Sequence, residues 1–330
     1  MEVGVMKWSK AQVQLLLSGL FLVLFLFALQ SQAIDRYVSS VKGIPVNGQN
    51  REEWMGKLQE LKAKHEIAPI DARIDPVWKA IPGYNGITLN IEKSLDKLED
   101  AGRFDHSLVV FEEVEPKVKL ADLNPSPIYR GNPDKPVVSF MINVAWGNEY
   151  LPEILRTLEK YNVKSTFFLD GSWVSKFPEE ARKIKQAGHE IGNHAFSHPD
   201  MKTISLNRIR LEISKTNEVI QKELDVKPTL FAPPSGSFDE RTVQMAAQDG
   251  MYTILWTLDT VDWRKPAPSE IIQRLTPKLD NGGLILMHPT ESSMKALPAL
   301  LESAQSKGLK VGTVSELISS GRVYPIEVKR

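Results

Sequence analysis

Residues 137–169 read VVSFMINVAWGNEYLPEILRTLEKYNVKSTFFL and predict a strand, a helix and a second strand. Residues 137–142 are apolar except for one serine, as in a strand that is buried on both faces. Residues 150–161 then place leucine and isoleucine at helical spacing, and residues 164–169 form another short strand-like run. Two parallel strands joined by a crossover helix form the basic unit of an α/β fold.

The same alternation continues toward the C-terminus. Further strands are expected at 229–232, 252–256, 283–287 and 310–314, and further helices at 179–187, 206–224, 240–247, 269–279 and 297–306. Ser205 stands directly before the long helix 206–224, where its hydroxyl can cap the first turn. Repeated βα units predict a parallel sheet, open or closed into a barrel, with functional residues at the carboxyl ends of its strands.

The region before residue 136 has a different composition. Residues 116–135 are rich in proline and are interpreted as a linker. Residues 35–115 predict a small α/β domain, with helices at 51–64 and 91–98 and strands at 87–91 and 107–112.

The N-terminus has the pattern of an export segment. Lys7 and Lys10 precede a nearly uncharged apolar run at 11–29, and the small-x-small sequence Ser31-Gln-Ala33 follows it. This order is typical of a secretory signal peptide or an uncleaved signal-anchor. A run of 19 residues is also long enough to span a bilayer. We therefore expect residues 1–33 to direct export, leaving the protein secreted or held in the cell membrane by residues 11–29.

Composition excludes two function classes. The 330 residues include 41 Lys and Arg and 41 Asp and Glu, so the formal net charge is zero and there is no electrostatic footprint for nucleic acid. The chain has no cysteine, which excludes disulfides and a thiol nucleophile.

Histidines are concentrated in one segment, residues 188–199, which reads GHEIGNHAFSHP. It contains three of the six histidines of the chain, and His194 and His198 lie four positions apart. Two imidazoles at this spacing can face one divalent metal ion. The spacing alone fits two surface histidines equally well.

Four other short segments follow predicted strands: 143–147, 231–236, 259–263 and 286–289. Together with the histidine pair, their order and content resemble the polysaccharide deacetylase family, also called the NodB homology domain or carbohydrate esterase family 4. KSTFFL at 164–169 and GHEIGNH at 188–194 look like the same family. The resemblance implies a distorted (β/α) barrel at 136–322. The order of export segment, small α/β domain and barrel is similar to sporulation-associated members from Gram-positive bacteria.

The resemblance also implies a chemistry. In this family a divalent metal, usually zinc, is held by one aspartate and two histidines; it polarises an acetamide carbonyl and activates water. A second aspartate acts as general base and an arginine orients it. By position, His194 and His198 match the two histidine ligands, and His288 matches the general acid. Asp262 matches the carboxylate partner of His288, with Asp259 as a second candidate.

Substrate contacts are implied in the same way. Trp263 matches an aromatic wall of the sugar site, and Pro234 and Asp259 match further contacts. The implied partner is an N-acetylated polysaccharide, peptidoglycan or a related glycan.

Two motifs depart from the family pattern. The position of the general base is Asn143, the position of the metal carboxylate is Val144, and the arginine position is Ala232. An amide does not take up a proton near neutral pH, and valine binds no metal. An arginine left beside a neutral amide would be an unpaired buried charge, so losing both partners together is physically coherent.

Two functions therefore stay open. The first is an exported deacetylase-like hydrolase with impaired activity, acting on cell-wall or spore-wall glycan through a divalent metal; Glu149, Asp170 and Asp259 are its candidates for a substitute ligand. The second is an inactive glycan-binding or scaffold protein. A glycosidase would need two carboxylates on opposite sides of the glycosidic bond. Asp259 and Asp262 lie three residues apart on one strand end, which is poor geometry for that reaction.

Overall fold

The computed structural model describes residues 48–323, which divide into two compact units. One unit comprises 48–65 and 89–111, and the other comprises 66–88 and 112–323. The expected export segment lies outside the described residues. Within residues 48–323, none of the helices combines the length and apolarity needed to cross a membrane.

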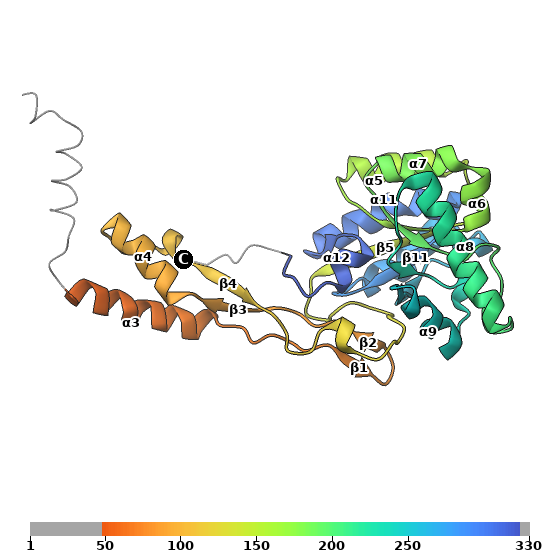
Figure 1. The fold of residues 1–330 in the computed structure, drawn as a ribbon. Coiled ribbons are helices and arrows are strands. Elements are labelled where there is room, and N and C mark those ends of the chain that lie inside the picture. Colours follow the sequence, from red (N-terminus) through yellow and green to blue (C-terminus); the bar gives the residue numbers. More distant parts are fainter. Residues whose placement is uncertain (1–47, 324–330) are drawn as a thin grey trace, which may run out of the picture. The chain divides into compact units, whose positions relative to one another are not determined.

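The smaller unit is built on two helices, α3 (Gly48–His65) and α4 (Ile91–Ala101) (Figure 1). Trp54 and Leu58 of α3 pack with Leu95 and Leu98 of α4 in one apolar core. The predicted strand at 107–112 is wrong in its first half, where the chain forms the 3-10 turn η1 (His106–Leu108). The reason is local, because the Asp105 carboxylate accepts the backbone N–H of Ser107 and starts a turn.

Five further short elements precede the first barrel strand. They are β1 (Arg73–Asp75), β2 (Lys79–Ile81), β3 (Gly86–Leu89), β4 (Phe111–Val114) and the 3-10 turn η2 (Leu120–Asp122). β1 pairs with β2 in an antiparallel ribbon, and β3 pairs with β4.

A curled parallel sheet forms the centre of the larger unit. Its strands are β5 (Val137–Val144), β6 (Thr166–Leu169), β7 (Glu190–Asn193), β8 (Leu230–Phe231), β9 (Tyr252–Thr253), β10 (Leu258–Asp259), β11 (Leu284–Met287) and β12 (Lys310–Val311). They follow the order β10-β11-β5-β6-β7-β8-β9, with β12 also on β5, and every pair is parallel. Among the described residues no pair joins β9 to β10, so the sheet is a half-barrel. The expected α/β fold with a deacetylase-type barrel is confirmed at this level.

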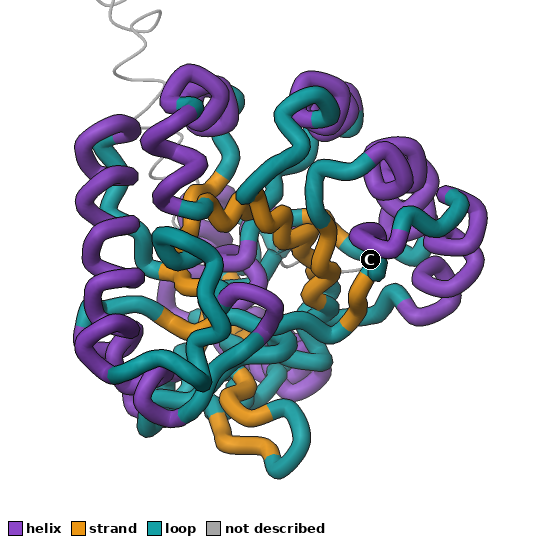
Figure 2. The backbone as a smooth tube through the Cα atoms, turned by 90° about the vertical axis from the view of Figure 1, so that its right-hand side faces the viewer, coloured by secondary structure: helices purple, strands orange, loops and turns teal. Residues whose placement is uncertain are grey.

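Helices cover the outside of the half-barrel (Figures 1 and 2). They are α5 (Leu151–Lys160), α6 (Gly171–Lys176), α7 (Pro178–Gln186), α8 (Leu206–Leu224), α9 (Glu240–Gln248), α10 (Pro268–Leu275), α11 (Glu291–Ser306) and α12 (Val314–Ile318). The expected cap of the long helix is confirmed, since the Ser205 hydroxyl accepts the N–H of Arg208. The expected strand at 310–314 is shorter than predicted because Thr313 caps α12.

The alternation of side chains along β5 decides what reaches the barrel interior. Val138, Phe140, Ile142 and Val144 share the core formed with α5, α7, α10 and α11, whereas Val137 and Met141 share the core inside the barrel. Successive side chains of a strand point to opposite faces. Asn143 therefore points inward at the carboxyl end of β5, and Val144 points outward beneath the helices.

Residues 116–135 contact the barrel along their second half. The Ile128 side chain is fully buried in the inner core, and its backbone bonds to Thr253 and Leu255. Lys135 is also buried, with its ammonium donating to the carbonyl oxygens of Glu316 and Ser319 at the end of α12, and burial lowers its pKa to about 8. The domain boundaries at 35–115, 116–135 and 136–322 stay a prediction.

Candidate functional site

A cavity of about 450 Å³ lies at the carboxyl ends of the central strands. Six of the eight predicted site residues line it: Asn143, His194, His198, Asp259, Trp263 and His288. They come from the last residues of β5 and β10 and from the segments that follow β7, β10 and β11. The parallel sheet thus brings motifs far apart in sequence to one edge.

His194 is held rigidly at the end of β7. Its side chain is 1% exposed, and its Nδ1–H donates to the backbone oxygen of Ala232 at 2.7 Å. Because a carbonyl oxygen only accepts, Nδ1 carries the proton and Nε2 keeps its lone pair. Burial lowers the pKa of His194 to about 3, so the ring is neutral at physiological pH.

His198 lies opposite on the exposed loop that follows β7. Its ring centroid is 5.2 Å from that of His194, with an angle of 72° between the ring planes. The backbone of His198 is left-handed, with φ of 54°. The structure therefore places the two predicted imidazoles side by side in one cavity.

A buried glutamate shapes the loop that carries His198. Glu212 of α8 accepts the N–H groups of Phe196 and Ser197 at 2.9 and 2.8 Å, and it pairs with Arg208 at 2.6 Å. Its side chain is 1% exposed. Sequence reasoning missed Glu212, although a glutamate between Ile209 and Ile213 on the buried face of an amphipathic helix was a signal.

His288 and Asp262 form the predicted pair. The Nδ1–H of His288 donates to Asp262 Oδ1 at 2.8 Å, and the backbone N–H of His288 donates to Oδ2 at 2.6 Å. Asp262 is fully buried in the 3-10 turn η4 (Asp262–Arg264). The ring of Trp146 stacks on His288 at 5.8 Å with an interplanar angle of 11°. Sequence reasoning did not single out Trp146, although it lies in the first motif.

Asn143 is buried in the wall of the cavity, with 3% of its surface exposed. Within residues 48–323 its Oδ1 has no hydrogen-bond partner. None of the residues that line the cavity is an arginine or a lysine. Ala232, at the arginine position, is fully buried, and Val144 lies in the outer core rather than in the cavity wall.

The three candidates for a substitute metal ligand either make hydrogen bonds with neighbouring residues or line another cavity. Asp170 caps α6 by accepting the N–H of Trp173 and the hydroxyl of Ser172, and burial raises its pKa. Asp259 lines the cavity with Oδ1 accepting the N–H of Val261. Glu149 lines a neighbouring cavity.

The donor set does not fit the metal centre of the family. Among the described residues, no three His, Cys, Asp or Glu side chains are grouped to hold a metal ion. Two imidazoles and an amide provide no anion, whereas zinc sites of this class use a carboxylate with two histidines. We therefore assign no chemical step to a metal.

Aromatic side chains border the cavity. Trp263 is 53% exposed and Trp146 is 46% exposed, and Trp256 also contributes to the wall. Pro234 is buried in the 3-10 turn η3 (Pro234–Gly236), and its neighbour Ser235 lines the cavity with φ of 54°. Trp256 and Ser235 were not anticipated from the sequence.

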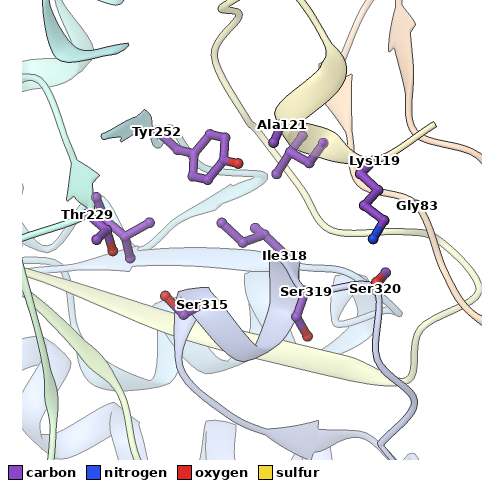
Figure 3. A pocket seen from close by; sticks show the side chains of 11 residues that line it. Gly83, Lys119, Ala121, Thr229, Tyr252, Ser315, Ile318, Ser319 and Ser320 are labelled. Atoms are coloured by element: carbon purple, nitrogen blue, oxygen red, sulfur yellow. The ribbon is translucent and has the colours of Figure 1, made fainter. Parts of the chain in front are cut away.

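Two more cavities help to delimit the site. One of about 680 Å³ shares Trp146 and Trp263 with the candidate site and extends toward α11. Another, of about 300 Å³, is shown in Figure 3 and lies at the opposite end of the strands, where Tyr252 begins β9. It contains none of the predicted site residues.

Comparisons with known proteins agree with this geometry. The family model described as polysaccharide deacetylase matches residues 130–254. An uncharacterized protein of Bacillus subtilis, YlxY, is 46% identical over 305 residues, which are 92% of this chain and 95% of that protein. A peptidoglycan-N-acetylglucosamine deacetylase of Bacillus cereus is 31% identical over 179 residues, covering 53% of this chain and 65% of that enzyme.

A solved structure is similar over most of the chain. BA3943 of Bacillus anthracis, described as a CE4 family pseudoenzyme, is 45% identical with a TM-score of 0.75. The match covers 82% of this chain and 96% of that one. A mutant of BA3943 described as having restored enzymatic activity has the same TM-score at 44% identity.

Proposed function

The chain belongs to the polysaccharide deacetylase family, and from this premise we propose that its barrel binds N-acetylated cell-wall glycan without hydrolysing it. The observation that carries the proposal is Asn143, an amide in the cavity wall at the position of the catalytic base. An amide takes up no proton from water at neutral pH. The alanine at the arginine position, Ala232, supports the same conclusion, and residue 144 brings no carboxylate to the cavity because Val144 lies in the outer core.

The substrate class is supported by the relatives and by the shape of the site. The Bacillus cereus relative is a peptidoglycan-N-acetylglucosamine deacetylase. In this chain the exposed rings of Trp146 and Trp263 border two adjoining cavities, which suits a chain of sugar rings. Peptidoglycan or a related glycan is therefore the proposed partner.

A second candidate is the impaired hydrolase, and the His288–Asp262 pair favours it. The geometry of this pair is suited to protonating a leaving amine, with the carboxylate orienting the ring. In this interpretation His194 and His198 bind zinc or another divalent ion weakly. Loss of a residue that only supports a ligand lowers metal affinity roughly 10–100-fold, and loss of a ligand itself lowers it more.

One assay separates the two candidates. The purified protein is incubated with peptidoglycan or chito-oligosaccharide and with zinc, cobalt or manganese, and released acetate is compared with that from His198→Ala. We expect no acetate above the variant, together with glycan binding that a chelator leaves unchanged. Acetate release that depends on metal and on His198 would instead establish the hydrolase.

Location and organisation are also proposals. We infer export through residues 1–33, with the protein secreted or held in the membrane by residues 11–29, and a glycan-binding barrel at 136–322. The domain order is similar to that of sporulation-associated family members, which supports a role at the wall of sporulating cells. Fractionation of cells that produce the full chain tests this, and recovery in the cytosol would contradict it.

A further inference from the structure

The side chain of Asn143 carries an unmet hydrogen-bonding capacity. It is nine-tenths buried or more, and its Oδ1 has no partner within residues 48–323. Buried polar groups in native proteins are almost always paired, so the unpaired Oδ1 of a residue in the cavity wall calls for a donor that enters the cavity. The side chain of Asn143 is on the inward face of β5, so its amide points toward the cavity.

The rest of the cavity restricts what that group is. The Nδ1–H of His194 donates to the backbone oxygen of Ala232 at 2.7 Å, which leaves the Nε2 lone pair as an acceptor. Leu286 and Trp256 contribute apolar surface to the same wall. An amide, a neutral acceptor and an apolar surface together complement a ligand with an N–H, a carbonyl and a methyl group.

We propose that Asn143 recognises the acetamido group of an N-acetylated hexosamine through paired amide–amide hydrogen bonds. Asparagine Nδ2–H donates to the acetyl oxygen, and Oδ1 accepts the acetamido N–H. This rests on the proposed glycan binding and goes beyond it, since the position of the lost base becomes a reader that distinguishes acetylated from free-amine sugar without metal.

A free-amine sugar fits this cavity poorly. Its ammonium group can donate to Oδ1 of Asn143, but it offers no carbonyl oxygen for the Nδ2–H group and no methyl group for the apolar wall. Taking an ammonium ion out of water costs free energy that is recovered only where acceptors or an anion surround it. Asp259, the acidic residue in the wall, already accepts the N–H of Val261 with one oxygen.

Calorimetric titration of the full chain tests the proposal. A chito-oligosaccharide and its fully de-N-acetylated counterpart are compared in buffer with EDTA, for the wild type and for Asn143→Leu, which keeps the branched shape and removes both hydrogen bonds. We expect the wild type to prefer the acetylated glycan by about tenfold or more, since a site that hydrogen-bonds a ligand rejects the analogue lacking that group. Asn143→Leu loses most of this preference.

Two further variants keep the result interpretable. Asn143→Asp is nearly isosteric with the wild type and lacks the Nδ2–H donor, so we expect it to lose the preference for the acetylated glycan as well. It serves as the test if the melting curve of Asn143→Leu shows that this variant does not fold. Trp263 lies on the exposed rim, so Trp263→Ala weakens the binding of both glycans by a similar factor and keeps the ratio of the two affinities. Equal wild-type affinity for the two glycans, or an unchanged ratio in both Asn143 variants, would overturn the reader role alone. Binding of neither glycan to the wild type would overturn glycan binding itself and the reader role with it.

Discussion

The imidazole of His194 donates from Nδ1 to the backbone oxygen of Ala232 at 2.7 Å. This bond joins the second motif, after β7, to the third, after β8, and it needs only the main chain of residue 232. Replacing the arginine of the family with alanine therefore leaves the imidazole oriented and the cavity intact. The scaffold of the site is therefore retained although the cavity wall, as far as the structure describes it, contains no arginine or lysine, and Asn143 stands at the position that we assign to the base.

The first prediction concerns Asp262. Asp262→Ala leaves the N–H and Nδ1–H groups of His288 without their acceptor in a buried setting. We expect the free energy of unfolding to fall by about 2–4 kcal/mol, because each unsatisfied buried donor costs about 1–3 kcal/mol. Urea denaturation measures this. Asp259→Ala, which removes one bond at a half-buried position, is the control, and an equal loss in both variants would refute the interpretation.

The second prediction concerns the loop that carries His198. In Glu212→Gln the carboxylate that accepts from Phe196 and Ser197 and pairs with Arg208 becomes neutral. We expect a loss of about 2–4 kcal/mol in unfolding free energy, because charge-assisted buried hydrogen bonds are the strong ones.

Glycan affinity should fall in the same variant, since the loop loses its anchor. The matched control is Glu153→Gln, which breaks an exposed ion pair with Arg156 and should cost less than about 1 kcal/mol. Similar melting temperatures for Glu212→Gln and the wild type would show that the loop does not depend on this carboxylate.

The third prediction is a pH dependence of stability. His189 is 6% exposed, its Nδ1 accepts the N–H of Ser165, and burial lowers its pKa from 6.5 to about 4. The unfolded chain then binds the proton more readily than the folded chain between pH 6.5 and 4, so stability falls as the pH is lowered through this window.

His189→Asn keeps a hydrogen-bond acceptor for Ser165 and removes the group that takes up the proton. From pH 7 to pH 5 the wild type should lose about 2 kcal/mol more than His189→Asn, given an unfolded histidine pKa near 6.5. Chemical denaturation at the two pH values measures the difference. Parallel losses in both proteins would exclude His189 as the source.

The fourth prediction concerns metal affinity and the direction of side chains on β5. Asn143→Asp adds an anion on the inward face beside His194 and His198. We expect zinc to raise the melting temperature of this variant, by an amount equivalent to about 2.7 kcal/mol at a hundredfold excess over Kd. The wild type should gain little, and Asn143→Asp/His198→Ala should lose the gain.

Val144→Asp provides the contrast, because residue 144 faces the outer core with Leu151 and Ile154. We expect it to lower the unfolding free energy by about 3 kcal/mol or more as a buried unpaired charge, with no stabilisation by zinc. A zinc-dependent rise for Val144→Asp and none for Asn143→Asp would show that the strand faces are assigned in reverse.

The sequence predicted the large features of the fold and most of the cavity. The helix at 206–224 and its Ser205 cap follow from periodicity and capping chemistry, and the motifs meet because parallel strands end at one edge. The strands at 229–232 and 252–256 were predicted too long, since β8 and β9 are each two residues long, and Ile254 adds only an isolated bridge to Ile128. Such ends are set by tertiary contacts that no local pattern encodes.

Other features of the site depend on three-dimensional packing. The stacking of Trp146 on His288 joins residues far apart in sequence, and the outward direction of Val144 follows from β5 continuing one residue beyond Asn143. Motif matching treated 143 and 144 as neighbours in one site, whereas strand alternation places them on opposite faces.

The central claim is that the site binds N-acetylated glycan without a metal and without hydrolysis. The most direct measurement is a calorimetric titration of the full chain with N-acetylated chito-oligosaccharide, with and without EDTA, followed by an acetate assay on the same samples. The account predicts one binding constant that the chelator does not change, and no released acetate. Binding that EDTA abolishes, or acetate that accumulates with time, would contradict it.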